Sequence, residues 1–198
     1  MKRIIFAVLA LAACNSSNEP FALDHAQILA VRSEPAHAPP GSTVRIDVLA
    51  GNDAGDVFIA VPDTLDAGGL AAVRGADGWY VTGPDKAFAP TIGVTLGIDG
   101  TNWAASKELV FGDAAANPTV AADAALDMTK GEKRALDATA GGVDPFTYAW
   151  YSSLGTLDHY REVEATFHAD TPGDGVVCVV VRDAQGGVAW QILPATVR

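Results

Sequence analysis

The sequence has little cysteine, and this limits how the fold can be stabilised. Its 198 residues include only Cys14 and Cys178. Two cysteines allow at most one intrachain bridge, so a framework of several disulfides is excluded. If Cys14 has another role, Cys178 has no partner, and we then expect Cys178 to act as an inert, small apolar residue.

Basic residues are also scarce. Lys and Arg together number 13 against 24 Asp and Glu, which gives a formal net charge of −11. A nucleic-acid-binding surface is basic, so we expect no nucleic-acid partner. An acidic body is also repelled by anionic lipid, so attachment to a membrane would have to come from acyl chains.

The sequence lacks the motifs of the common enzyme classes. The four histidines have no zinc-ligand spacing, and neither a Gly-x-Ser-x-Gly elbow nor a phosphate-binding Gly-rich loop with Lys-Ser/Thr occurs. We therefore expect no catalytic residues, no cofactor and no metal site. The acidic loops at 52–56 and 170–174 could offer oxygen ligands to calcium, but neither has the spacing of a calcium hand, and solvated turns explain both.

No apolar run is long enough to cross a bilayer, which takes about 20 residues. Ile4–Ala13 has ten apolar residues after the basic pair Lys2-Arg3, the pattern of a secretory signal peptide. The end of this run together with the following cysteine, Leu11-Ala12-Ala13-Cys14, resembles the lipobox of bacterial lipoproteins. An ordinary signal peptide with an incidental cysteine is the alternative.

The lipobox resemblance implies that the peptide is cut before Cys14 and that Cys14 carries the lipid. Asn15, rather than Asp, follows the cysteine, and by resemblance to lipoprotein sorting in some Gram-negative bacteria this implies the outer membrane. We therefore expect an exported protein, anchored in the cell envelope by acyl chains, with an envelope protein as partner. Residues 1–13 would be the signal peptide and 14–24 a flexible tether.

Turn-forming residues are abundant. The chain has 20 Gly and 11 Pro, and Asp outnumbers Glu by 18 to 6, which favours short strands joined by turns. The clearest alternation runs from Thr91 to Ile98, followed by a hairpin-type turn at 99–102 and a closing strand at 107–111. About seven strands predict a β-sandwich over residues 25–112, and residues 113–117 read as a linker.

Six further strands are expected, at about 119–127, 132–139, 145–151, 163–168, 175–182 and 188–193. Residues 118–198 resemble the immunoglobulin-like modules of bacterial surface proteins, including the polycystic-kidney-disease type. The resemblance rests on Phe146-Thr147-Tyr148-Ala149-Trp150, Gly155-Thr156, Ala165-Thr166-Phe167, Pro172-Gly173, Val177–Asp183 and Gly186-Gly187. It implies a buried Trp150, and the period-two pattern around that residue favours the same. The acidic turn that usually follows the Trp in that type is absent.

The strand near residue 180 is apolar on both faces. If Val177 and Val179 face the core, then Val176, Val180 and Arg182 face outward. One interpretation is a central strand covered on both faces. The other is an exposed surface that meets a partner or the first domain.

The sequence thus predicts an all-β fold of two tandem immunoglobulin-like sandwiches. The expected function is non-enzymatic: a lipid-anchored envelope protein that acts as a binding or structural spacer module. The alternative is a carbohydrate-binding accessory module, with exposed aromatic rings stacking on sugars. Its candidate residues are Trp79, Tyr80 and Trp103, for which closure of the core is the simpler explanation.

Overall fold

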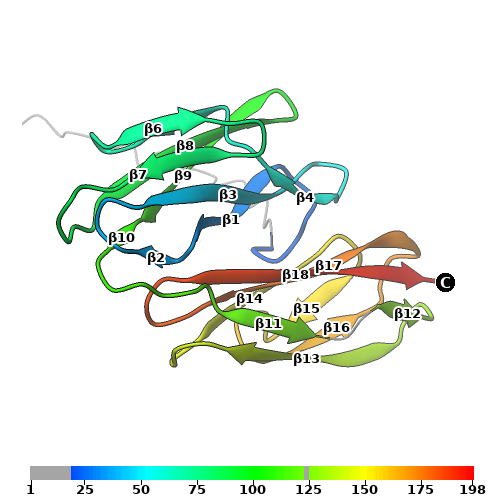
Figure 1. Cartoon of the computed structure of the whole chain (residues 1–198). Coiled ribbons are helices and arrows are strands. Elements are labelled where there is room, and N and C mark those ends of the chain that lie inside the picture. The colour runs from blue at the N-terminus through cyan, green and yellow to red at the C-terminus, as the bar shows by residue number, and fades with distance from the viewer. Residues whose placement is uncertain (1–18, 123–124) are drawn as a thin grey trace, which may run out of the picture.

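A computed structural model describes residues 19–122 and 125–198. The expected signal peptide and lipid-attachment residue Cys14 lie outside this range. The described chain is all-β and forms two sandwiches, which we call the first unit (β1–β10) and the second unit (β11–β18) (Figure 1). No helix in this part of the chain has the length and apolar character needed to cross a bilayer.

Two sheets form the first unit. One has the strand order β1-β3-β7-β6, with β4 also paired to β3, and the other has the order β5-β8-β9. A short parallel pair, β2 with β10, closes one end. The strands are β1 (Gln27–Glu34), β2 (His37–Ala38), β3 (Thr43–Gly51), β4 (Val57–Ala60), β5 (Thr64–Asp66), β6 (Ala71–Arg74), β7 (Trp79–Thr82), β8 (Thr91–Ile98), β9 (Thr101–Glu108) and β10 (Val110–Phe111).

The second unit repeats this plan with two four-stranded sheets. Their orders are β11-β13-β16-β15 and β12-β18-β17-β14, and β12 runs parallel to β18. The strands are β11 (Thr119–Ala122), β12 (Leu126–Met128), β13 (Lys133–Gly141), β14 (Thr147–Ser152), β15 (Thr156–Asp158), β16 (Glu164–His168), β17 (Gly173–Arg182) and β18 (Val188–Val197).

Both units have the strand order of an immunoglobulin domain. In that fold the first, second, fifth and fourth strands form one sheet, and the third, sixth and seventh form the other. The sheets β1-β3-β7-β6 and β5-β8-β9 follow this order, as do β11-β13-β16-β15 and β14-β17-β18. The all-β prediction of two tandem immunoglobulin-like sandwiches is confirmed.

The alternating sequence of β8 explains how the first core forms. Ile92, Val94, Leu96 and Ile98 are all buried in that core, while Thr91 and Gly97 are exposed. The turn after β8 consists of Asp99 and Gly100, both with positive φ, as a two-residue hairpin with right-handed strand twist requires. Pairing therefore resumes at Thr101, so the predicted closing strand at 107–111 was placed too late.

In the second core, Trp150 is fully buried, as the pattern around it predicted. Its indole Nε1 donates to the Glu162 carbonyl at 3.0 Å, which satisfies the ring's polar atom inside the core. The fully buried Phe167 and Val179 pack in the same cluster from the two opposing sheets.

The tether predicted for 14–24 is wrong for its last residues. Phe21 is 6% exposed and packs in the second core, and Leu23 is 2% exposed. The backbone carries this segment along β14: Leu23 N donates to the Ser152 carbonyl, and Ser152 N donates to the Phe21 carbonyl. Burial of two large apolar side chains is favourable in free energy. The sequence does not reveal this burial, because the residues around them are mostly polar.

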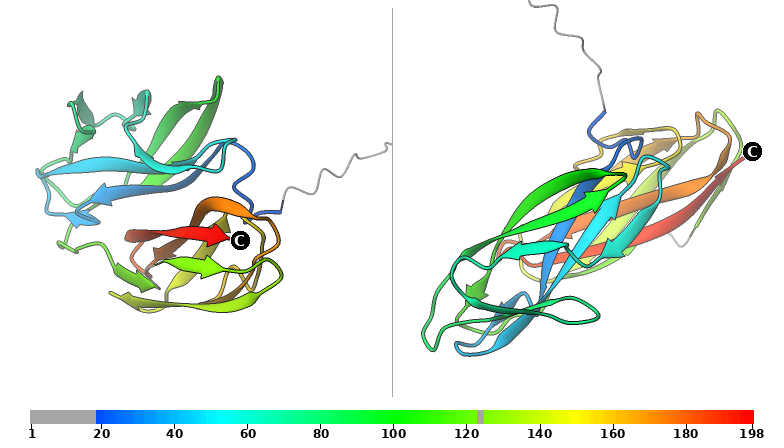
Figure 2. Two further views of the ribbon diagram at one scale, coloured as in Figure 1. Left: turned by 90° about the vertical axis from the view of Figure 1, so that its right-hand side faces the viewer. Right: turned by 90° about the horizontal axis from the view of Figure 1, so that it is seen from above.

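The two units lie side by side and not end to end. Figure 1 shows the first unit above the second, with β1 and β3 next to β17 and β18, and the two further views are given in Figure 2. Contacts between β1 and β18 confirm that these two sheets are neighbours. The chain turns back through residues 113–117 to allow this stacking.

Candidate functional site at the junction of the two units

A third apolar cluster, which we call the junction cluster, lies between the two sandwiches. It is separate from both cores and takes residues from each unit. Its buried members are Leu29, Ala30 and Leu49 of the first unit, Cys178, Val180 and Val188 of the second, and Leu23 of the segment before β1. Val57, Tyr151, Val176, Trp190 and Ile192 pack around them. Apolar surface on both units is thus removed from water, so the junction stabilises one fixed arrangement of the units.

A β-bulge in β1 supplies two side chains to this cluster. The register of β1 against β3 shifts between Ile28 and Ala30, so that Leu29 is an extra residue. An extra residue redirects the side chains after it. As a result Leu29 and Ala30 both face the junction, while Ile28 and Val31 pack on the first core.

On the other side of the junction, simple alternation divides β17 between two clusters. Val177, Val179 and Val181 belong to the second core. Cys178 and Val180 belong to the junction cluster and are as completely buried as the core residues. Burial in apolar surroundings raises the pKa of the Cys178 thiol to about 12, so the thiol stays protonated and unreactive near neutral pH.

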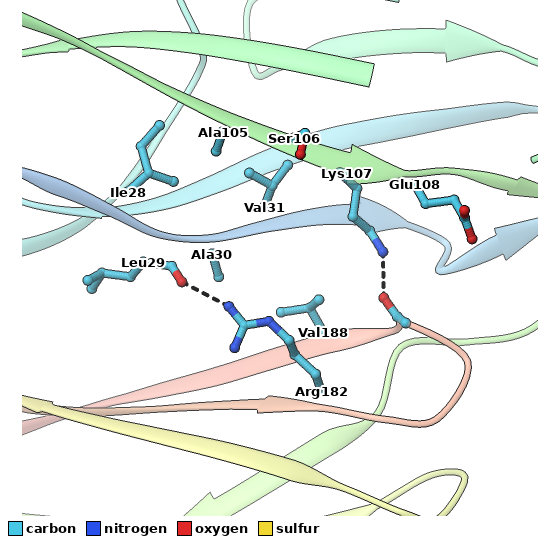
Figure 3. A pocket seen from close by; sticks show the side chains of 11 residues that line it. Ile28, Leu29, Ala30, Val31, Ala105, Ser106, Lys107, Glu108, Arg182 and Val188 are labelled. Atoms are coloured by element: carbon cyan, nitrogen blue, oxygen red, sulfur yellow. Dashed lines mark hydrogen bonds between the residues drawn. The ribbon is translucent and has the colours of Figure 1, made fainter. Parts of the chain in front are cut away.

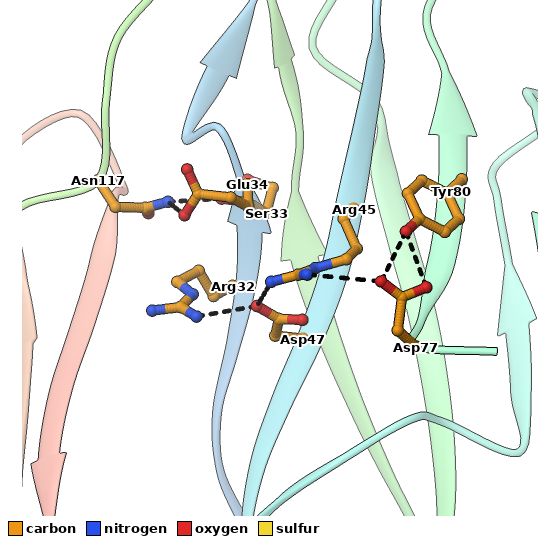
Figure 4. Close-up of polar contacts among 8 residues, drawn as sticks. All are labelled: Arg32, Ser33, Glu34, Arg45, Asp47, Asp77, Tyr80 and Asn117. Carbon is orange, nitrogen blue, oxygen red and sulfur yellow. Dashed lines mark hydrogen bonds and ion pairs between the residues drawn. The ribbon is translucent and has the colours of Figure 1, made fainter. Parts of the chain in front are cut away.

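Beside the apolar cluster lies a charged network on the first unit (Figure 4). The carboxylate of Asp47, 6% exposed, accepts from Arg32 at 2.8 Å and from Arg45 at 3.0 Å. The Arg32 guanidinium lies 4.1 Å from the ring centre of Trp190 in the second unit, a cation–π contact across the junction. The network therefore neutralises a buried carboxylate and also links the two units.

The network continues to Tyr80, which donates from its hydroxyl to both carboxylate oxygens of Asp77 at 2.8 and 2.9 Å. This hydrogen bond raises the pKa of the Tyr80 hydroxyl above its ordinary value. Asp77 also lies 3.8 Å from Arg45. Ion pairs and hydrogen bonds, rather than apolar contacts, thus connect the side chains on the outer face of β3 and β7.

Asn117, in the linker, fixes the β17–β18 turn against the first unit. Its Nδ2 donates to the Ser33 carbonyl at 2.8 Å and to Glu34 at 2.9 Å, and its Oδ1 accepts from the Val188 amide at 2.9 Å. One side chain therefore joins β1, the linker and β18. The linker is a structural part of the junction and not a free hinge.

A pocket of about 350 Å³ opens where this turn meets β1 and β9 (Figure 3). Two cations line it, one from each unit. Lys107 Nζ donates to the Gly186 carbonyl, and Arg182 donates to the Leu29 carbonyl at 3.0 Å. Its remaining lining residues are Ile28, Ala30, Val31, Ala105, Ser106, Glu108 and Val188.

Burial changes the chemistry of Lys107. This residue lies on the same side of β9 as Trp103 and Ala105, which pack against the first core. Burial lowers the pKa of the Lys107 ammonium, and the positive charge of Arg182 adds to the shift, while Asp183 and Glu108 oppose it. The pocket therefore holds two cations close enough to repel each other.

The structure gives the sequence-based site residues different surroundings. Val180 is fully buried against the first unit, and Val176 is partly buried beside it. Of the two occupants considered for this surface, a partner or the first domain, it is the first unit that covers it in the structure. Arg182 does lie at the junction, with its guanidinium in the pocket wall.

The three aromatic residues considered for glycan stacking do not form one platform. Trp79 and Tyr80 are neighbours on β7, so their side chains point to opposite faces of the sheet. Trp79 packs on the first core, donates to the Pro62 carbonyl at 2.8 Å and lies under Arg74, while Tyr80 joins the outer charged network. Trp103 is half-buried against the same core.

Among the described residues no group of three His, Cys, Asp or Glu could hold a metal ion. In the two acidic loops considered for calcium, several side-chain oxygens accept hydrogen bonds from other groups of the protein. Asn52 Oδ1 accepts from the Asp56 amide at 2.8 Å, and Asp53 accepts from the Ala26 amide at 2.6 Å. Asp170 accepts from the Thr156 hydroxyl at 2.8 Å.

Comparisons with known proteins are limited to overall fold. No family model matches the chain, and no curated protein matches it. Among solved structures, the Ig1-2 module of the Drosophila receptor tyrosine phosphatase DLAR is 11% identical, with a TM-score of 0.41, over 88% of this chain and 99% of that one. A chimeric titin Z1Z2 tandem is 15% identical, with a TM-score of 0.38, over 87% and 99%.

The fibronectin(III)-like modules of Clostridium thermocellum CbhA are 13% identical, with a TM-score of 0.36, over 85% of this chain and 94% of that one. All three structures share only a low similarity with this chain. At such low similarity they say nothing of its activity or ligands, and the assignment of the fold rests on the strand orders given above.

Proposed function

We propose that this chain is a non-enzymatic, lipid-anchored protein of the cell envelope whose two sandwiches act as one rigid binding module. The anchor would be Cys14, exposed as the first residue after cleavage, and Asn15 favours the outer membrane. The second unit would be of the polycystic-kidney-disease type. A tandem of immunoglobulin-like sandwiches is consistent with a binding or structural role, although fold alone does not decide function.

The observation that carries the proposal is the junction cluster. Tandem domains joined by an exposed linker move freely and act as spacers. In this chain Leu49, Val180 and Cys178 are fully buried between the units. The side-by-side packing shortens the molecule and presents both units as one surface. We therefore favour the binding role over that of an extended spacer.

The N-terminal segment supports a position close to the membrane. Phe21 and Leu23 are bound to the second unit. Only the few residues from Cys14 to Pro20 would separate the acyl chains from the folded body. A body held this close would face partners at the membrane surface, and its net negative charge would keep it from lying flat on anionic lipid.

Expression of the full chain in a Gram-negative host tests the anchor. Intact mass and membrane fractionation of the wild type should show loss of residues 1–13 and added acyl mass in the membrane fraction. Cys14→Ser should be soluble and unacylated, and Cys178→Ser should behave as the wild type. A wild-type protein that is mature, soluble and without acyl mass would contradict the proposal.

A second experiment tests the binding role. Crosslinking of the membrane-bound wild type, followed by mass spectrometry, should give envelope proteins linked to both units. The matched control is a Val180→Asp variant, in which the two units separate and the joint surface is lost. Crosslinks that persist unchanged in this variant would show that the units bind independently and not as one module.

A further inference from the structure

We propose that the pocket between β1, β9 and the β17–β18 turn binds a small organic monocarboxylate. Lys107 and Arg182 would hold its carboxylate, and Ile28 and Val31 would contact its apolar part. The inference is independent of the membrane anchor.

The first support is that, in the part of the chain that the structure describes, neither cation forms an ion pair. Among the described residues, no carboxylate oxygen lies within the 4.0 Å of an ion pair from Lys107 or Arg182. Each instead donates to a backbone carbonyl. In a chain with nearly twice as many acidic as basic residues, two neighbouring cations in one pocket without a described carboxylate in ion-pair contact favour the binding of an anion.

The second support is the energetic situation of Lys107. Burial of its ammonium lowers the pKa; the negative charges of Asp183 and Glu108 oppose this shift, and the positive charge of Arg182 adds a smaller lowering effect. The nearby carboxylate of Asp183 is occupied, because its Oδ1 accepts from the amides of Gln185 at 3.0 Å and Gly187 at 2.7 Å. An anion bound between the two cations would offset both the burial and the repulsion.

The lining of the pocket selects the class of anion. Ile28, Val31, Ala105 and Val188 provide apolar walls, which fit a hydrocarbon part (Figure 3). Glu108 also lines the pocket, and its negative charge disfavours an anion with two charges. A volume of about 350 Å³ lies in the range of small-molecule sites. A monocarboxylate with a short apolar chain meets all three conditions, whereas phosphate has no hydrocarbon part for the apolar walls and carries up to two charges near neutral pH.

Such a carboxylate has two sources, a free short-chain acid or the C-terminus of a peptide. The shared chemistry is one carboxylate next to an apolar group. The pocket is open to solvent beside the edge strands β1 and β9, so either source can reach it.

Isothermal titration of the full-length protein tests the proposal. The probes are butanoate, hexanoate, inorganic phosphate, and an acetylated tripeptide Ala-Ala-Leu with a free or an amidated C-terminus. The variants are Lys107→Met, which removes the charge, and Lys107→Arg, which keeps it. Lys86→Met is the matched control, because Lys86 is an exposed lysine of the same unit.

We expect hexanoate or the free-acid peptide to bind the wild type, with hexanoate tighter than butanoate and phosphate weakest. Lys107→Met should weaken binding at least tenfold, Lys86→Met should change it less than twofold, and Lys107→Arg should restore most of it. A tighter free-acid peptide would identify a peptide C-terminus as the source, and a tighter hexanoate a free acid.

The alternative is that both cations serve only as clamps between the units. It predicts that no probe binds the wild type at millimolar concentration, or that Lys107→Met and Lys86→Met bind equally, and either result would overturn the proposal. Phosphate that binds tighter than hexanoate would overturn the class of ligand. Alkylation of Cys178 in each variant shows whether the junction has stayed closed, and binding lost in Lys107→Met with the junction closed supports the site.

Discussion

The two faces of β17 have nearly the same composition, but they are buried by different means. On one face Val177, Val179 and Val181 pack within their own sandwich. On the other, Cys178 and Val180 are equally inaccessible because a separate unit covers them. Burial of the first face is local to one domain. Burial of the second depends on residues more than 120 positions away in the chain.

This difference teaches how an apolar strand should be interpreted in a tandem protein. The face in a domain core is exposed to water only when that domain unfolds. The face at the junction is exposed when the two domains separate, even if both stay folded. The junction of this chain has both an apolar cluster and a charged network, so its disruption should be separable from unfolding. The predictions below contrast the two faces, from the largest expected effect to the smallest.

Replacement of Trp150 by Ala should have the largest effect, because it removes a fully buried ring and the hydrogen bond to Glu162. We expect a loss of about 3–5 kcal/mol in the free energy of unfolding. Chemical denaturation followed by circular dichroism would measure it. A loss below about 1 kcal/mol would mean that the ring is not part of a packed core.

Replacement of Leu49 by Ala should have a smaller effect, of about 2–3 kcal/mol, although this side chain is as buried as Trp150. The reason is that water or a shift of the units can fill part of a cavity at a junction. Denaturation monitored separately for each unit should show the two transitions moving apart. The wild type is the reference, in which we expect one joint transition. If both units of the variant also unfold together, Leu49 belongs to a core and not to the junction.

Replacement of Asp47 by Asn should cost about 1–3 kcal/mol, because it removes the counter-charge of Arg32 at the junction and leaves Arg45 with Asp77 alone, at 3.8 Å. The arginine side chains are 21% and 36% exposed, so solvent screening reduces the effect from that of a fully buried pair. Asp127→Asn is the matched control, since Asp127 and its partner Arg198 are mostly exposed. We expect the control to be unchanged in thermal denaturation, and equal effects in the two variants would contradict a special role for Asp47.

The pH dependence due to Cys178 should be the smallest effect up to about pH 9.5, where it amounts to less than about 1 kcal/mol. Its pKa is about 12 when folded, above the ordinary value of 9.0, so the unfolded chain loses this proton first as the pH rises. The thiol therefore contributes its full stability below pH 9, and the contribution declines between pH 9 and 12, by up to about 1.4 kcal/mol per pH unit.

The difference in unfolding free energy between the wild type and Cys178→Ala isolates this contribution. Lys107, with a lowered pKa, acts in the opposite direction, but it is present in both proteins and cancels. A difference that stays constant from pH 8 to pH 10.5 would mean that the thiol is hydrated in the folded state, and so that the junction is open.

Much of the fold could be predicted because it follows from local patterns. The strands at 79–82, 91–98 and 188–193 follow from alternation and turn residues, and so does the burial of Trp150. The two-residue strands β2 and β10 could not be found, because two residues carry no period and their pairing joins segments far apart in sequence. The closing strand was placed late because β9 has polar residues on its outer face.

Only one side of the junction could be predicted from the sequence. The outward face of Val176 and Val180 follows from period two, but the identity of what covers it does not. The bulge at Leu29 gives a signal in retrospect, since Ile28-Leu29-Ala30-Val31 is a continuous apolar run where one-sided burial needs alternation. The sequence around Lys107 did not indicate a pocket, because the pocket forms only where β9 packs next to the β17–β18 turn.

The central claim, that the two units form one body, is tested most directly by a distance distribution from pulsed electron spin resonance. Spin labels on Val73→Cys and Val163→Cys, exposed positions in different units, report on the arrangement, and Cys14→Ser leaves Cys178 as the one native cysteine of the sequence. Cys178 should stay unlabelled. We predict one narrow distance peak, which Val180→Asp converts into a broad distribution. A broad distribution in the parent protein would contradict the account.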